Sequence, residues 1–214
     1  MPNQSEQLEK TRQKVREVLE EASRELGTVF NYKDLSSIIQ LLKEAQVSLP
    51  KDAILVTDST KPAYLGFSEY SSHTPRSYLF PCGYGTLGMA LPAAIGAKKA
   101  HPDKAVCVLA GDGGFQFTMP ELGVACQENL TLPIILYNNH GLGEIRVYEE
   151  EDNFDSIIGV DYKNPEFKSL AAAYGIPHYL ISKKGDLQSA LTKALDLSTP
   201  SLIEVNINDD NHHS

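Results

Sequence analysis

Two short polar motifs in the centre of the sequence carry groups suited to binding a metal ion and a phosphate. Asp112 lies between Gly111 and Gly113 directly after an apolar run, and Asn138 and Asn139 follow the next apolar run. If both runs are neighbouring strands of a parallel sheet, their carboxyl ends share one edge, and these side chains should meet there. Carboxylate and amide oxygens suit a hard cation, and the backbone amides of a glycine-rich turn suit the phosphate that it carries.

The composition indicates a globular protein without a nucleic-acid surface or a membrane span. The 214 residues are 42% hydrophobic and 22% charged, which is enough for one substantial core. A net charge of -9 argues against nucleic acid or an anionic membrane, and no apolar run is long enough to span a bilayer. The start lacks a signal-peptide pattern, and Cys82, Cys107 and Cys126 share no metal-binding spacing, so we expect a cytoplasmic protein with reduced cysteines.

Apolar runs alternate with helical patterns, which predicts an α/β fold, a doubly wound parallel sheet with helices on both faces. We expect strands at residues 53–57, 78–80, 105–110, 133–137, 178–181 and 201–207. We expect helices at 35–46, from about 88 to 100, at 118–129, from the Asn164-Pro165-Glu166 motif to Gly175, and at 186–197. The helix at 118–129 has an apparent capping box, Thr118 to Glu121.

Three regions follow from this pattern. Residues 1–30 are expected to be an N-terminal helical extension, with a narrow apolar stripe over 5–26, and residues 31–208 the main domain. Residues 209–214 are expected to be a disordered tail. The acidic run from Glu149 to Asp152 is interpreted as a solvated region with a short helical stretch rather than a metal site.

One glycine motif permits a different function. Gly83, Gly85 and Gly88 match the G-x-G-x-x-G fingerprint of dinucleotide-binding domains, so an NAD-dependent oxidoreductase is an alternative. The preceding strand is short, however, and Asp112 has glycine on both sides, which a ribose-binding acid does not require. Glycine on both sides instead indicates backbone pressed against a ligand.

The two polar motifs, taken with their spacing, resemble a known family. The run from Gly111 to Gly113, followed after 24 residues by Asn138 and Asn139, resembles the signature of thiamine diphosphate-dependent enzymes. Residues 83–97 resemble a second marker of the acetolactate synthase-like branch, and residues 53–64 and 159–167 resemble its 2-oxo acid decarboxylases. The resemblance covers residues 32–207 and implies the C-terminal diphosphate-binding domain of a longer polypeptide, with thiamine diphosphate and Mg²⁺ as cofactors and a 2-oxo acid as substrate.

The resemblance also implies roles for individual residues. Asp112 and Asn139 would bind Mg²⁺ through side-chain oxygens and Gly141 through its carbonyl, while the amides of Gly113 and Gly114 would face the diphosphate. The other implied cofactor residues are Ser59 and Thr60 (further donors, or simply turn residues), Gly85 (carbonyl to the aminopyrimidine), Thr86, Leu87 (an apolar wedge under the bent cofactor) and Leu142. Lys61 and Pro62 stand where acetolactate synthases usually carry glutamine and histidine, which argues against that activity.

The family's activating carboxylate comes from a pyrimidine-binding domain on a neighbouring subunit. The resemblance therefore implies a homodimer and no catalytic residue within this chain. The residues before the match are too few for such a domain, so we expect the chain alone to bind the cofactor weakly or not at all and to be inactive. Two alternatives stay open: the diphosphate-binding subunit of a split two-chain decarboxylase, and a non-catalytic regulatory module on the same fold.

Overall fold

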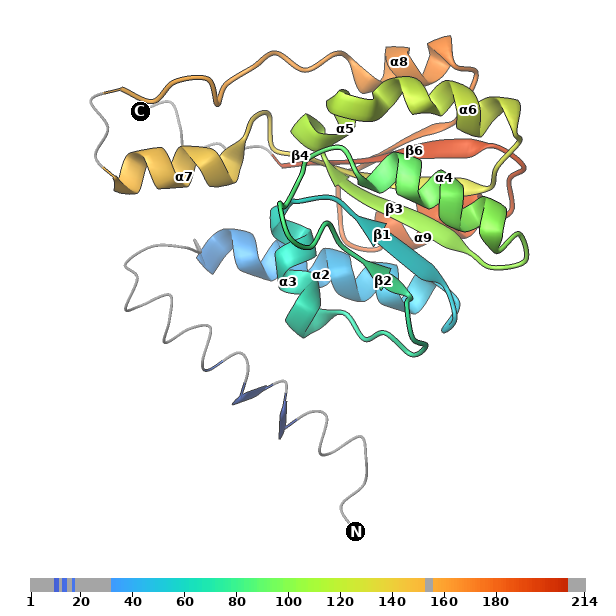
Figure 1. The fold of residues 1–214 in the computed structure, drawn as a ribbon, viewed down its shortest axis with the longest axis horizontal. Coiled ribbons are helices and arrows are strands. Elements are labelled where there is room, and N and C mark those ends of the chain that lie inside the picture. The colour runs from blue at the N-terminus through green and yellow to red at the C-terminus, as the bar shows by residue number, and fades with distance from the viewer. Residues whose placement is uncertain (1–9, 12, 15–16, 18–31, 153–155, 208–214) are drawn as a thin grey trace.

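Six parallel strands form one sheet at the centre of the protein. The computed structural model describes residues 10–11, 13–14, 17, 32–152 and 156–207. The strand order is β2-β1-β3-β4-β6-β5 (Figure 1). The strands are β1 (Ile54–Thr57), β2 (Tyr78–Leu79), β3 (Val106–Gly111), β4 (Leu132–Asn138), β5 (His178–Ile181) and β6 (Pro200–Asn206). The predicted doubly wound α/β sheet is confirmed, and each strand lies within one residue of its expected bounds.

Helices cover both faces of the sheet (Figure 1). On one face lie α2 (Tyr32–Ser48), α3 (Lys61–Glu69) and α9 (Asp186–Leu195), and on the other lie α4 (Ala90–Ala100), α5 (Asp112–Thr118), α6 (Leu122–Gln127) and α8 (Phe167–Ala173). Successive strand residues point to opposite faces. In β3, Val106 and Val108 pack into the core under α4, whereas Cys107 and Leu109 pack into the core under α2. The strands therefore have no polar face, as a covered parallel sheet requires.

The helix expected at 118–129 is the main correction. Helix α5 begins earlier, at Asp112, and ends at Thr118, where a 3-10 turn, η1 (Met119–Glu121), separates it from α6. The predicted capping box is wrong, because the Thr118 side chain caps no helix and its hydroxyl donates to the Gly88 carbonyl at 2.9 Å. Pro120 lacks an amide proton, which favours a break in the helix there. Asp112 consequently lies in the first turn of a helix rather than in a loop.

Helices α3 and α7 and the two chain ends remain to be compared with the sequence-based prediction. Helix α3 has no counterpart in the sequence-based prediction, and α7 (Gly143–Glu151) contains most of the acidic run. The few described residues between 10 and 17 are helical, while the rest of the expected helix at 5–26 and the tail at 209–214 lie outside the described residues. Within the described part of the chain, no helix combines the length and apolarity needed to cross a membrane.

The strand order identifies where a ligand would bind. Strands β1 and β3 are neighbours, although β2 lies between them in the sequence. The chain leaves β1 for α3 on one face and leaves β3 for α5 on the other. Such a reversal opens a crevice at the carboxyl ends of the two strands, which is where ligands bind in open α/β sheets.

Candidate functional site

The three predicted metal ligands lie together beside this crevice. Asp112 immediately follows β3 and Asn139 immediately follows β4, and the register pairs Gly111, the last residue of β3, with Tyr137, one residue before the end of β4. Gly141 forms an antiparallel bridge with Asp161. This bridge holds the loop after β4 against residues 156–166, which we call the strap. We call the group formed by Asp112, Asn139 and Gly141 the cation cradle.

The side-chain amide of Asn139 closes the cation cradle. One of its two terminal atoms lies 2.9 Å from Asp112 Oδ1 and 3.0 Å from the carbonyl oxygen of Gly141. As a nitrogen this atom donates to both oxygens, and a half-turn of the amide replaces it with oxygen. In that orientation three oxygens would face one another without a proton between them, an arrangement that a cation would stabilise. Neighbouring ligands of an octahedral Mg²⁺ are about 2.9 Å apart, so the spacing fits this ion.

The electrostatics of Asp112 also favour a cation. Its side chain is 1% exposed, and this desolvation raises the pKa of the Asp112 carboxyl, while hydrogen bonds from Asn164 and from the Gly113 amide oppose the rise. A buried carboxylate is costly until an opposite charge compensates it. Among the described residues, no three His, Cys, Asp or Glu side chains are placed to hold a metal. The remaining ligands must therefore be neutral oxygens, which suit Mg²⁺ rather than a softer metal.

A second buried carboxylate, Asp58, holds the glycine loop that precedes α4. Asp58 follows β1, is 1% exposed, and accepts hydrogen bonds from the Gly88 amide at 3.0 and 2.9 Å and from the Ser59 amide at 2.9 Å. Burial raises the pKa of Asp58, and these amides together with those of Met89 and Ala90 oppose the rise. A dinucleotide fingerprint needs such amides for a pyrophosphate. Here the carboxylate occupies them, so the dinucleotide interpretation has no free donors at α4.

Some of the predicted cofactor residues around the glycine loop are buried or hydrogen-bonded within the chain, and others are accessible to a ligand. The Ser59 hydroxyl donates to the Gly85 carbonyl at 2.8 Å, so both Ser59 donors are used within the chain. Thr60 precedes α3 and is buried without capping that helix. Thr86 is exposed and Leu87 is half-buried. Of this group, the structure leaves Thr86 and Leu87 accessible to a ligand.

Gly113 and Gly114 are buried, and their missing side chains matter. A Cβ on Gly114 would lie 3.0 Å from the Asp58 carboxyl carbon, and a Cβ on Gly113 would lie 2.5 Å from the Tyr162 hydroxyl and 2.8 Å from Leu142 Cδ2. A Cβ at either position would therefore displace these neighbouring side chains, so the close approach to the α5 backbone favours glycine at both positions. Leu142, also a predicted cofactor residue, directly precedes α7, and its side chain lies against Gly113.

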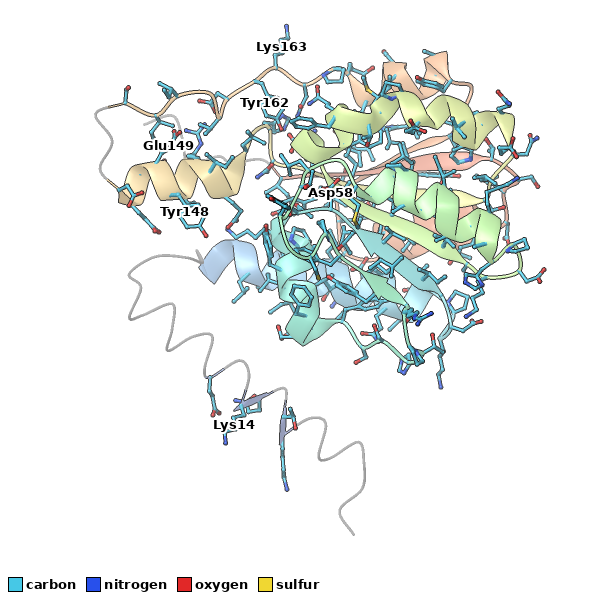
Figure 2. All side chains as sticks on the ribbon, viewed as in Figure 1. Lys14, Asp58, Tyr148, Glu149, Tyr162 and Lys163 are labelled. Carbon is cyan, nitrogen blue, oxygen red and sulfur yellow. The ribbon has the colours of Figure 1, made fainter. Side chains whose placement is uncertain are left out.

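Several residues of the site escaped the sequence analysis. Asp58 follows a buried strand, just as Asp112 does, so the same rule about strand ends would have found it. Tyr162 lies on the strap and is directed toward the body of the domain, whereas the neighbouring Lys163 points away from it (Figure 2). Desolvation and the nearby charge of Asp112 raise the pKa of Tyr162. Asn164, also on the strap, donates to Asp112 Oδ2 at 2.7 Å. Both strap residues lie within residues 159–167, which resemble the decarboxylases, but the sequence assigns neither of them a role in the site.

Fold and site together define a doubly wound α/β domain with an oxygen-lined cation cradle at the switch point of its sheet. Comparison with known protein families matches most of this domain to one family. Residues 63–205 match the family described as thiamine pyrophosphate enzyme, C-terminal TPP binding domain. The chain belongs to the thiamine pyrophosphate (thiamine diphosphate) enzymes and contains their C-terminal cofactor-binding domain, which confirms the resemblance seen in the sequence.

Individual relatives place the chain in the decarboxylase and acetolactate synthase branch. The probable 2-ketoarginine decarboxylase AruI of Pseudomonas aeruginosa is 39% identical over 173 residues, which are 77% of this chain and 30% of AruI. The acetolactate synthase large subunit of Lactococcus lactis is 38% identical over 165 residues, 75% of this chain and 28% of that protein. The thiamine diphosphate-dependent 4-hydroxybenzoylformate decarboxylase structure from Rhodococcus jostii RHA1 has a TM-score of 0.74 and 34% identity, covering 80% of this chain and 32% of that one. The chain thus spans about 30% of the length of these relatives.

Proposed function

We propose that this chain binds Mg²⁺ through Asp112, Asn139 and the Gly141 carbonyl and, through Mg²⁺, the diphosphate of thiamine diphosphate, as part of a 2-oxo acid decarboxylase. The observation that carries the proposal is the convergence of three oxygen-bearing groups, one of them a buried carboxylate, at distances that fit an octahedral ion. Residues 31–208 would form the cofactor domain, with 1–30 as an extension and 209–214 as a tail.

Neighbouring residues would complete the cofactor site. The amides of Gly113 and Gly114, in the first turn of α5, would donate to the diphosphate, and the Gly113 amide would give up its present hydrogen bond to the Asp112 carboxylate. Thr60, Thr86 and Leu142 would line the same space. Leu87, half-buried beside the cation cradle's crevice, would support the cofactor from below. Ser59 would act through Gly85, whose carbonyl accepts a hydrogen bond from the Ser59 hydroxyl and keeps a second lone pair for the aminopyrimidine.

The bound thiamine diphosphate supplies an electron sink that lets a 2-oxo acid lose carbon dioxide. The chain's own residues hold the cation and orient the cofactor. Asp112 offsets the charge of the cation, and Asp58 fixes the loop that carries Gly85 and Leu87. The names of the relatives support the substrate class, since 2-ketoarginine and 4-hydroxybenzoylformate are both 2-oxo acids. Carboligation, as in acetolactate synthases, is a second outcome for the same chemistry.

The proposed enzyme needs a second domain. Since the chain spans about 30% of its relatives, we place the carboxylate that activates the aminopyrimidine on a pyrimidine-binding domain outside this chain. The working unit would be a cytoplasmic homodimer, with sites between subunits. The isolated chain would bind the cofactor weakly or not at all and would release no carbon dioxide.

Calorimetry with thiamine diphosphate and Mg²⁺ tests the proposal. The full chain is titrated with and without a separately supplied pyrimidine-binding domain, beside Asp112→Ala and a matched control, Asp103→Ala, which removes an exposed carboxylate. We expect the added domain to strengthen binding, Asp112→Ala to abolish it, and Asp103→Ala to leave it unchanged. Binding by Asp112→Ala equal to that of the wild type would refute the cation cradle. Carbon dioxide release from pyruvate by the chain alone would refute the need for a partner.

A further inference from the structure

Asn164 connects the strap to the carboxylate of the cation cradle. Its amide nitrogen donates to Asp112 Oδ2 at 2.7 Å and to Asn138 Oδ1 at 2.8 Å, and its oxygen accepts from Gln116 Nε2 at 2.8 Å. A half-turn of this amide would place its oxygen against two acceptors and its nitrogen against a donor. The three contacts therefore fix the orientation of Asn164, with the donor side toward Asp112.

The side-chain amide of Asn138, which contacts Asn164, also has a fixed orientation. Asn138 is 2% exposed, and its nitrogen donates to Glu204 Oε1 at 2.7 Å. The other Glu204 oxygen pairs with His178 Nε2 at 2.8 Å, and this contact is the largest cause of the lowered pKa of Glu204. Since Glu204 can only accept when ionised, the Asn138 oxygen must face Asn164. A chain of hydrogen bonds thus runs from β5 to Asp112 and sets the direction of each amide.

The two oxygens of Asp112 consequently have different surroundings. Oδ2 accepts the short bond from Asn164, whereas Oδ1 faces the Asn139 amide inside the cation cradle. A carboxylate with one oxygen held in this way offers a cation one oxygen rather than two. Mg²⁺ takes single oxygens in near-ideal octahedral geometry, whereas Ca²⁺ has a larger shell of six to eight ligands and readily takes both oxygens of one carboxylate.

We propose that Asn164 is a positioning residue that keeps Asp112 monodentate and thereby biases the cation cradle toward Mg²⁺ over Ca²⁺. The inference rests on the proposed function, because it concerns the same cation. It adds a residue that lies outside the two polar motifs, in the segment 159–167, and assigns it a measurable property, cation selectivity. Loss of a residue that only stabilised the fold would weaken the binding of both cations alike.

The test compares two cations on one chain. Magnesium chloride and calcium chloride are titrated separately into the full chain, and the side-chain amide signal of Asn139 is followed by NMR, which detects weak binding. Asn164→Leu keeps the branching and the number of heavy atoms of the side chain and donates no hydrogen bond, and Asn164→Ser is a smaller second variant in case the first folds poorly. Gln116→Met is the matched control, since it removes a hydrogen bond to Asn164 and leaves both acceptors of the Asn164 nitrogen in place.

We expect the ratio of the Ca²⁺ to the Mg²⁺ dissociation constant to fall about tenfold in both Asn164 variants, the factor associated with one charge-assisted hydrogen bond. In Gln116→Met the ratio should stay within about twofold of the wild type. An unchanged ratio in an Asn164 variant, with both affinities reduced equally, overturns the positioning role and leaves the proposed function standing. Failure of the wild type to bind either cation overturns this inference, whereas the proposed function is decided separately, by the calorimetry with the added pyrimidine-binding domain.

Discussion

Replacement of Gly113 by alanine measures how closely the strap and α7 approach the first turn of α5. Gly113 does not have a positive φ, so its backbone accepts alanine without strain, and helix propensity alone would stabilise the variant by about 1 kcal/mol. The surroundings oppose this gain. The added methyl would lie 2.5 Å from the Tyr162 hydroxyl and 2.8 Å from Leu142 Cδ2. Unstrained carbon contacts lie at about 3.5–4 Å, so these neighbours must move by about 1 Å.

The expected cost follows from these distances. Overpacking of this kind costs about 1–3 kcal/mol, which exceeds the gain from helix propensity. Gly113→Ala should therefore lower the free energy of unfolding by about 1 kcal/mol. Gly96 is the matched control, because it also lies in a helix, α4, and a Cβ there would meet nothing within 4 Å. Gly96→Ala should raise the free energy of unfolding by about 0.5–1 kcal/mol.

Urea unfolding followed by circular dichroism gives both values. The two variants should differ by about 2 kcal/mol, and equal stability of the two would refute the close approach at Gly113. A double variant identifies the contact. Tyr162→Phe removes the nearest atom, so it should recover at least about 0.5 kcal/mol in the Gly113→Ala background. If it recovers nothing, the Tyr162 hydroxyl is not what the methyl meets.

Three further outcomes concern ionisation and reactivity. Burial raises the pKa of the Asp112 carboxyl above 3.8. Without divalent cations, the contribution of Asp112 to stability is therefore complete below its unfolded pKa and is lost as the pH rises through its folded pKa. Urea unfolding across this pH range should show the wild type losing stability relative to Asp112→Asn, and parallel curves would contradict this. The hydrogen bond from His178 lowers the pKa of Glu204 below 4.5. The contribution of Glu204 to stability is therefore present above its unfolded pKa and is lost as the pH falls through its folded pKa. Glu204→Gln should make the free energy of unfolding depend less on pH on the acid side, and an unaltered dependence would count against the Glu204–His178 pair. Burial raises the pKa of Cys107 to about 12, whereas Cys82 is exposed; a thiol reagent followed by mass spectrometry should modify Cys82 first and Cys107 only on unfolding, and early labelling of Cys107 would contradict its burial.

The sheet and the two polar motifs could be predicted because their signals are local. Buried parallel strands are continuous apolar runs, and the strand from Leu132 to Asn138 is buried at every residue. Neighbouring parallel strands end at one edge, so Asp112 and Asn139 had to lie close together. The helix boundaries were harder, because Thr118 and Glu121 match a capping box while the Thr118 hydroxyl is used by the Gly88 carbonyl of another segment.

The strap shows why the rest of the site could not be predicted. Asn164 and Pro165 match the start of a helix, yet Glu166 is the residue that caps α8, accepting from the Ser169 amide at 2.6 Å. The Asn164 side chain is used instead by Asp112, 52 residues earlier in the sequence. Contacts of this kind depend on how two loops meet after the sheet has formed, and neither periodicity nor composition contains that information.

Residues 142–152 leave the sheet edge, and residues 156–160 return to nearly the same point. The Leu142 amide donates to the Val160 carbonyl at 2.9 Å, and the next residues outward, Gly141 and Asp161, pair with each other. Between these closed ends, α7 buries none of its residues. Changes of length or sequence inside the excursion should therefore leave the oxygen donors undisturbed. Besides these closed ends, an ion pair at 3.7 Å between Glu144 of α7 and Lys61 of α3 joins the excursion to the domain. The excursion is therefore a replaceable segment attached at its base and through this charged contact, beside ligand groups that the core anchors.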